Sequence, residues 1–229
     1  NVGRPIRVRA FTLMASSFKS SSVTSKLPLM QAKNSGVNPA PTSCSSVAVL
    51  LTQGHNLRDV TEAVATMAPV PGRMQVIDGG PKWPRVVVDY AHTPDAIEKA
   101  LAALRPQCRG ELICIVGCGG DRDSGKRAQM GRAAAKGSDR VWFTSDNPRS
   151  EDPERILADM AYGLELPNSQ RVRSEVNRAE AIAVALQSAD PDDILLIAGK
   201  GHEQTQEING EFIPFSDFTV VHDIQGENN

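Results

Sequence analysis

The sequence predicts an α/β fold, a Rossmann-like, mostly parallel sheet with helices on both faces, followed by a C-terminal β-hairpin. Beyond residue 73, short apolar runs rich in Val and Ile alternate with helical runs of about ten residues, which is the pattern of a parallel sheet covered by helices. Two helical runs begin with a capping side chain followed by proline. Near the C-terminus, Asn209-Gly210 separates two short strand-like runs, which is a strong hairpin signal.

The first part of the chain has a different character. Residues 1–46 mix Ser, Gly, Pro and Asn without periodicity, so they predict irregular structure. From Val47, apolar residues recur at helical spacing, with a break at residues 53–55. We therefore expect two short helices there, the second capped by Asn56.

Pro69–Gly72 has the composition of a linker. We expect a domain boundary there, with residues 1–70 in one domain and residues 71–229 in a second.

Beyond the linker, the expected N-caps are Thr93, Asp152 and Asn177, the last in a capping box with Glu180. The predicted elements are strands at Met74–Ile77, Arg85–Asp89, Glu111–Val116, Arg140–Thr144 and Asp193–Ala198, helices at Pro94–Leu104, Lys126–Lys136, Pro153–Leu164, Arg178–Ser188 and Ser216–Ile224, and a hairpin of Gln206–Ile208 with Glu211–Ile213.

Composition narrows the possible functions. A formal charge of −2 over 229 residues gives no general attraction to nucleic acid or to acidic membranes. The 4 cysteines are too few for a disulfide framework at this length. Cys114 and Cys118 are close in sequence, but no second pair of Cys or His lies at the spacing of a zinc site. No apolar run approaches the roughly 18 residues of a membrane span. We expect a cytoplasmic monomer without a resident metal, a nucleic-acid partner or a membrane partner. We also expect a piece of a longer protein, because the chain begins at Asn1 rather than Met.

Polar, charged and glycine residues gather where four of the predicted strands end. These segments are Asp89–Pro94, Gly117–Arg127, Ser145–Arg149 and Ala198–Glu203. Ligands of open α/β sheets bind at the carboxyl ends of the strands, so we expect a ligand site there. Taken singly, Asp89, His92 and the turn-forming Asp146-Asn147-Pro148 also fit ordinary turns.

The glycine-rich segment Gly117–Arg127 contains G-x-x-x-x-G-K, most of a phosphate-binding loop. However, Arg127 stands where such a loop needs a Ser or Thr hydroxyl on magnesium. A dinucleotide fingerprint is also incomplete, because its third glycine would fall at Arg122. We expect the loop to be one wall of a different site, with glycines that let its backbone approach the ligand.

The charged residues limit the ligand. Arg122 and Arg149 carry planar forks that suit a carboxylate or a phosphate. Asp146 and Glu203 only accept hydrogen bonds when ionised, which suits an ammonium group. Opposite charges in one crevice predict a zwitterion such as an amino acid.

At these residues the chain resembles the carboxy-terminal domain of the Mur ligase family, most closely its MurE type, the UDP-N-acetylmuramoyl-tripeptide synthetases. The resemblance covers about residues 47–229. It implies that residues 1–70 are a poorly matching remnant of the family's central domain and that residues 71–229 are its C-terminal, acceptor-binding domain. Its strings are Pro71-Gly-Arg-Met74, Val88-Asp-Tyr-Ala-His-Thr-Pro-Asp95, Gly117-Cys-Gly-Gly-Asp-Arg-Asp123 with Gly125-Lys-Arg127, Asp146-Asn-Pro-Arg149 and Gly199-Lys-Gly-His-Glu203.

The resemblance implies an ATP-dependent ligase that joins meso-2,6-diaminopimelate to UDP-N-acetylmuramoyl-L-alanyl-D-glutamate through an acyl phosphate. It implies that the acceptor amino acid contacts Arg122, Asp146, Asn147, Pro148, Arg149, Gly199 and Glu203. It also implies that Arg73, Asp89, Tyr90 and His92 face the adenosine part of ATP. Lysine lacks the second carboxylate of diaminopimelate, so it would leave an arginine fork unpaired.

The family's catalytic parts are not in this sequence. Its G-T-x-G-K-T phosphate loop and the carbamylated lysine that holds Mg²⁺ belong to the central domain, and the UDP-gripping domain is a further one. We therefore expect no catalytic residue here and no ligation by this chain alone. An inactive fragment that only binds an amino acid or a nucleotide is the alternative.

Overall fold

The structure is a computed structural model, and it describes residues 49–65, 70–162, 164 and 171–227. The chain divides into two compact units, residues 1–68 and 69–229. The predictions for residues 1–46 lie outside the described residues. No helix in the described ranges is long and apolar enough to cross a membrane.

In the first unit, residues 49–52 are helical and a turn separates them from α4, Leu57–Ala65. The side-chain oxygen of Asn56 accepts a hydrogen bond from the backbone N–H of Asp59 at 2.9 Å. The predicted break and cap are therefore confirmed.

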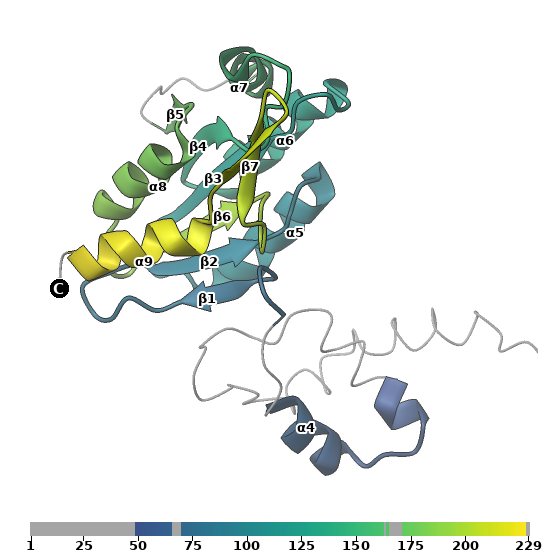
Figure 1. Ribbon diagram of the computed structural model, residues 1–229. Coiled ribbons are helices and arrows are strands. Elements are labelled where there is room, and N and C mark those ends of the chain that lie inside the picture. Colours follow the sequence, from purple (N-terminus) through teal and green to yellow (C-terminus); the bar gives the residue numbers. More distant parts are fainter. Residues whose placement is uncertain (1–48, 66–69, 163, 165–170, 228–229) are drawn as a thin grey trace, which may run out of the picture. The chain divides into compact units, whose positions relative to one another are not determined.

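The second unit contains a six-stranded sheet in the order β1-β2-β6-β3-β4-β5 (Figure 1). β1 runs antiparallel to β2, and every other neighbouring pair is parallel. The strands are β1 (Gln75–Ile77), β2 (Arg85–Asp89), β3 (Leu112–Cys118), β4 (Arg140–Ser145), β5 (Val172–Glu175) and β6 (Ile194–Ala198). The predicted fold class is confirmed.

β3 lies between β6 and β4, and all of its residues are buried, which explains its unbroken apolar sequence. Burial raises the pKa of the Cys114 and Cys118 thiols to about 12, so both act as small apolar core residues. β5 was missed by sequence reasoning because V-R-S-E is a half-exposed edge strand with a single apolar residue.

Helices cover both faces of the sheet. α5 (Pro94–Leu104), α6 (Gly125–Gly137) and α7 (Pro153–Ala161) share one apolar core with the sheet. α8 (Arg178–Gln187) and α9 (Asp217–Glu227) share a second core on the other face (Figure 1). A short 3-10 helix, Arg105–Gln107, follows α5.

The predicted N-caps are confirmed, with one correction to the capping box and one to the end of a helix. Thr93 and Asp152 accept hydrogen bonds from Ala96 N–H and Glu154 N–H. Asn177 caps α8 as predicted, but its own N–H donates to Glu175 at 2.8 Å rather than to Glu180, so the capping box is incomplete. The helix predicted to reach Leu164 ends at Ala161.

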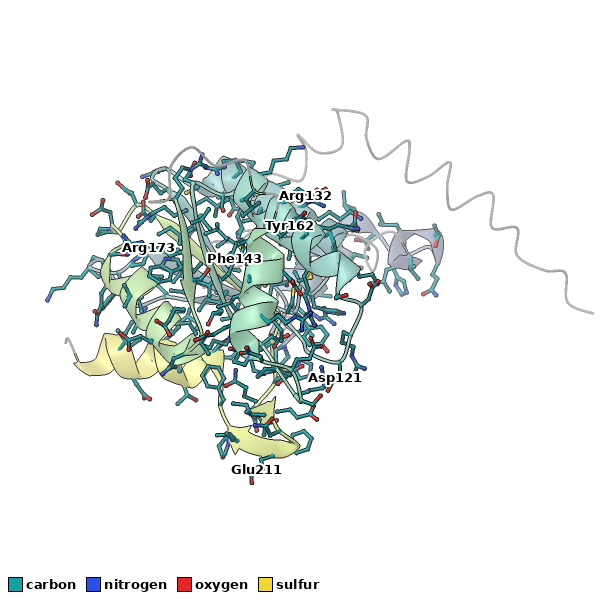
Figure 2. The ribbon with its side chains drawn as sticks, turned by 90° about the horizontal axis from the view of Figure 1, so that it is seen from above. Asp121, Arg132, Phe143, Tyr162, Arg173 and Glu211 are labelled. Atoms are coloured by element: carbon teal, nitrogen blue, oxygen red, sulfur yellow. The ribbon has the colours of Figure 1, made fainter. Side chains whose placement is uncertain are left out.

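The hairpin pairs β7 (Thr205–Ile208) with β8 (Glu211–Pro214). Asn209 and Gly210 both have positive φ, 50° and 80°, which is the turn that their sequence predicts. Figure 2 shows the hairpin projecting from the domain, with Glu211 at its outer end and Asp121 of the β3–α6 loop on the same side.

Candidate functional site

The four strand ends singled out in the sequence meet at one edge of the sheet. β2, β6, β3 and β4 are neighbours and parallel, so their carboxyl ends point the same way. Backbone hydrogen bonds join the loops that follow them: Gly199 N–H donates to Asp89 O at 3.1 Å, and Gly120 N–H donates to Asn147 O at 2.9 Å. These loops form one continuous surface.

Two glycines, Gly117 near the end of β3 and Gly120 in the loop that follows, let this segment pack against its neighbour. A Cβ at Gly120 would lie 1.9 Å from Pro148 O, and one at Gly117 would lie 2.5 Å from Thr144 O. At these two positions the expectation that glycine makes room for a ligand is corrected, because backbone of β4 and of the loop after it fills the space. Pro148 itself is buried at this contact.

Arg127, which spoils the phosphate-loop motif, has a structural role. Its side chain is 3% exposed and bonds to Glu151 at 2.7 Å and to Asp159 at 2.9 Å. It therefore fastens α6 to α7 and to the loop after β4.

Arg149 is held by the hairpin and by the glycine-rich loop. Its Nε donates to Glu207 at 2.9 Å, and its Nη1 donates to Gly120 O at 2.8 Å. Its backbone, at φ 53°, pairs with β7 through Arg149 N–H to Glu207 O and Asn209 N–H to Arg149 O, at 3.0 and 2.8 Å. The guanidinium is fixed in place, and its Nη2 has no hydrogen-bond partner among the described residues.

Arg122 is exposed and makes no hydrogen bond or ion pair within the described ranges. A Cβ at Gly119 would lie 2.9 Å from Arg149 Nη1 and 3.8 Å from Arg122 Cγ. Both arginines therefore border the same glycine, and their binding of one anion stays a prediction.

A buried polar cluster lies beside the arginines. Asn147 Nδ2 donates to Glu203 Oε2 at 3.0 Å, and Lys200 Nζ donates to Asn147 Oδ1 and Glu203 Oε2 at 3.1 and 3.0 Å. Lys200 Nζ also lies 3.7 Å from Asp146 Oδ1. Neither side-chain oxygen of Asp146 accepts a hydrogen bond from any residue that the structure describes, and its side chain is 13% exposed.

The pKa values of the two carboxyls shift in opposite directions. Burial raises the pKa of Asp146, although the charges of Arg178 and Lys200 oppose the shift. Burial also opposes ionisation of Glu203, but hydrogen bonds from Asn147 and Lys200, with the charges of Lys200 and Arg178, lower its pKa. Glu203 is thus the firmly ionised carboxylate of the cluster.

Gly199 has a φ of 113°, and a Cβ there would contact the Asp146 carboxylate at 3.6 Å. Its N–H already donates to Asp89, so Gly199 connects the acidic cluster to the end of β2. A side chain at this position would be strained by the backbone conformation.

The residues assigned to adenosine lie together at the end of β2. The Arg73 guanidinium lies 4.6 Å from the centre of the Tyr90 ring, and His92 and His202 lie 4.7 and 5.6 Å from it. Asp89 is buried and accepts from Met74 N–H at 2.7 Å. Burial raises the pKa of Asp89, against the hydrogen bonds and the Arg73 charge that lower it. His202 was not assigned a role from the sequence, although it stands in the G-K-G-H-E string.

Sequence reasoning also missed Arg178 and Asp217. Both side chains are fully buried, with Arg178 Nε and Nη2 on the two Asp217 oxygens at 2.8 and 2.9 Å. The same guanidinium donates to Ser145 O and Ala198 O, at the ends of β4 and β6. No local motif marks this pair, because its members are 39 positions apart.

The described residues contain no group of three or more His, Cys, Asp or Glu side chains that could hold a metal ion. The part of the chain that the structure describes brings arginine, carboxylate and aromatic side chains to one edge of the sheet.

An α/β domain with charged and glycine-rich loops at the carboxyl ends of its strands is typical of a ligand-binding domain. Residues 72–201 match the family described as Mur ligase, glutamate ligase domain. The chain therefore belongs to the Mur ligase family.

Among relatives, the chain is 54% identical over 148 residues to the UDP-N-acetylmuramoyl-L-alanyl-D-glutamate--2,6-diaminopimelate ligase of Coxiella burnetii, covering 65% of this chain and 30% of the relative. It is 49% identical over 175 residues to the enzyme of the same name from Pseudomonas putida, covering 76% and 35%. A solved structure of a ligase with this name shares 42% identity at a TM-score of 0.66, covering 80% of this chain and 37% of that one. The chain spans about a third of the length of the relatives it matches.

Proposed function

We propose that this chain is the acceptor-binding part of a MurE-type, ATP-dependent ligase. In the proposed reaction, meso-2,6-diaminopimelate is joined to UDP-N-acetylmuramoyl-L-alanyl-D-glutamate through an acyl phosphate. The names of relatives about 50% identical to the chain support this assignment. The chain would carry no catalytic residue itself and would work only together with the rest of such a ligase.

The observation that carries the proposal is the pairing of opposite charges at one sheet edge. Arg149 offers a fixed fork with Nη2 open, beside the exposed Arg122. Asp146 has unused acceptor capacity, and Glu203 is held ionised next to it. The far end of diaminopimelate has one carboxylate and one ammonium, which complement these two halves.

ATP is the proposed nucleotide, and Mg²⁺ is the proposed metal. A half-buried tyrosine ring under an arginine is a suitable platform for an adenine base, and Arg73 and Tyr90 provide it, with Asp89 and His92 beside them. The described residues do not fit Mg²⁺, because they include no cluster of metal-binding side chains, so the magnesium ligands would belong to the rest of the ligase.

Isothermal calorimetry on the 229-residue chain tests the acceptor assignment. We expect meso-diaminopimelate to bind more tightly than lysine, because only diaminopimelate fills the arginine fork. Arg149→Ala should weaken diaminopimelate binding by about 10- to 100-fold, the effect of losing a charged hydrogen bond worth about 1.5–3 kcal/mol.

The same substitution should leave lysine binding nearly unchanged. Arg109→Ala is the matched control, since Arg109 is exposed and precedes β3 at the opposite end of the strand. Tighter binding of lysine than of diaminopimelate by the unmodified chain would contradict the assignment.

A binding module without a role in ligation is the second candidate. It is favoured by the side chains of Arg149 and Glu203, which are held in place by contacts within the described part of this chain. Both candidates predict amino-acid binding, whereas binding of NAD in the same calorimetric series would point to a dinucleotide domain instead. Restoration of ligation when the chain is joined to the remaining domains of a relative would decide for the enzyme.

A further inference from the structure

Lys200 is a fully buried cation in the acceptor site. Its side chain is 0% exposed, so it cannot itself contact a ligand in the crevice. Its ammonium lies against oxygens of Asn147, Glu203 and Asp146, at 3.1, 3.0 and 3.7 Å. These oxygens come from two loops, the one after β4 and the one after β6, so Lys200 joins the two loops from within.

The charged groups around Lys200 come from four parts of the fold. Asp146 follows β4, Glu203 follows β6, Arg178 begins α8 and Asp217 begins α9. Arg178 is already committed to Asp217 by two hydrogen bonds. Lys200 is therefore the cation that lies against Asp146 and Glu203. Its hydrogen bond and charge help to keep Glu203 ionised, whereas burial raises the pKa of Asp146.

We propose that Lys200 is a positioning residue, which holds Glu203 and Asn147 in the geometry that receives the ammonium group of the acceptor amino acid. The proposal rests on the proposed function for its ligand, but its structural part concerns this chain alone. Removing the Lys200 ammonium takes one hydrogen bond and one positive charge from Glu203, so the pKa of that carboxyl should rise.

Lys200→Met is a suitable variant because both acceptors keep another donor. Glu203 Oε2 still receives Asn147 Nδ2–H, and Asn147 Oδ1 still receives Glu207 N–H, each at 3.0 Å. Methionine fills most of the same volume without a charge. Lys99→Met is the matched control, since Lys99 forms an exposed pair with Asp95 on α5.

The first measurement needs no ligand. The side-chain carboxyl carbon of Glu203 is followed by NMR as a function of pH in the ¹³C-labelled chain, and Glu203→Gln assigns its signal. We expect Glu203 to titrate at higher pH in Lys200→Met than in the unmodified chain or in Lys99→Met. An unchanged titration would overturn the proposal.

The second measurement is the affinity for meso-diaminopimelate as a function of pH. Above its raised pKa, Glu203 of Lys200→Met is ionised and attracts the ammonium group, and below that pKa the attraction is lost. We expect Lys200→Met to bind about tenfold or more weaker than the unmodified chain below the raised pKa of Glu203, and to recover much of this loss above it. An equal loss at every pH would mean that Lys200 acts only in folding, which would also overturn the proposal.

These results separate the proposal from the proposed function. If the unmodified chain does not bind diaminopimelate, the acceptor assignment fails, while the NMR titration still decides whether Lys200 controls Glu203. If Lys200→Met folds but is too unstable for the binding assay, its loss of unfolding free energy is compared with the loss that the same substitution causes in the Glu203→Gln background. A smaller loss there would support the coupling, and an equal loss would refute it.

Discussion

At the scale of single residues, Arg178 and Asp217 fix the ends of two strands. Arg178 donates hydrogen bonds to both carboxylate oxygens of Asp217. It also donates to the last carbonyls of β4 and β6. Those carbonyls immediately precede the loops with Asp146 and Gly199. A fully buried ion pair adds little net stability by itself, so its contribution is to fix the position of these loops.

Arg178→Met should destabilise the domain strongly, because it leaves the Asp217 carboxylate buried without its partner. Breaking a buried pair in this way costs about 3–5 kcal/mol. Urea denaturation measures the change in the free energy of unfolding. The double variant Arg178→Met/Asp217→Leu should lose less than Arg178→Met alone, since no unpaired charge remains.

Arg132→Met is the control for this pair. Arg132 is exposed on α6 (Figure 2), and its replacement should change the stability by no more than about 0.5 kcal/mol. Equal stability of Arg178→Met and Arg132→Met would show that the buried pair does not hold the strand ends.

The candidate site residues that could be predicted from the sequence are charged residues that follow directly after apolar strands. Two arginines and two acids after successive apolar strands pointed to the site without any structure. The burial of Lys200 was not predictable, since G-K-G is also typical of an exposed flexible turn. Arg178 and Glu207 could not be found either, because each acts on a partner 39 or 58 positions away.

At the scale of elements, the hairpin acts as a support for the loop after β4. Gln206 Nε2 donates to Asp146 O at 2.8 Å, and Glu207 N–H donates to Asn147 Oδ1 at 3.0 Å. Arg149 pairs with Ile208 as a parallel bridge. The loop after β4 is thus attached to β7 almost as an additional strand.

Gly210→Ala should loosen this support, because Gly210 has φ 80° and an alanine there is strained although no atom would clash with it. A left-handed conformation costs a residue other than glycine about 1–2 kcal/mol. We expect the amides of Arg149, Glu207 and Asn209 to exchange with solvent about 5- to 30-fold faster by NMR.

Amides of the central strand β3 should keep their protection in the same sample. Asn209→Gly is the control, because glycine also accepts positive φ and the backbone bond to Arg149 O remains possible. Unchanged exchange at Arg149 in Gly210→Ala would mean that the loop stands without the hairpin.

Strongly patterned elements were predictable, and weakly patterned ones were not. The parallel strands and their helices follow from apolar runs and caps, and the hairpin follows from Asn209-Gly210. β5 was not predicted, because its strand conformation depends more on pairing with β4, where Val172 lies opposite Val141, than on its own sequence. Register and strand order depend on such contacts between distant segments.

At the scale of the whole molecule, the second unit has what it needs to fold alone. Among the described residues, its two apolar cores, one on each face of the sheet, are formed by residues between Met74 and Ile224. The unit covers residues 69–229, and a domain of about 150 residues buries roughly 70% of the surface of its unfolded chain. The residues proposed to bind the acceptor all belong to this unit.

Residues 69–229 should therefore unfold cooperatively in urea, at nearly the same midpoint as the second unit of the full chain, and bind meso-diaminopimelate with unchanged affinity.

A chain of residues 74–229 is the sharper comparison. Gly72 packs so closely that a Cβ there would lie 2.1 Å from His202 N, and its N–H donates to Gln75 at 2.8 Å. Arg73 covers the Tyr90 ring. Starting the chain at Met74 should thus lower the midpoint and weaken ATP binding while diaminopimelate affinity falls less. Loss of cooperative unfolding in 69–229 would show instead that the first unit is needed for the second to fold.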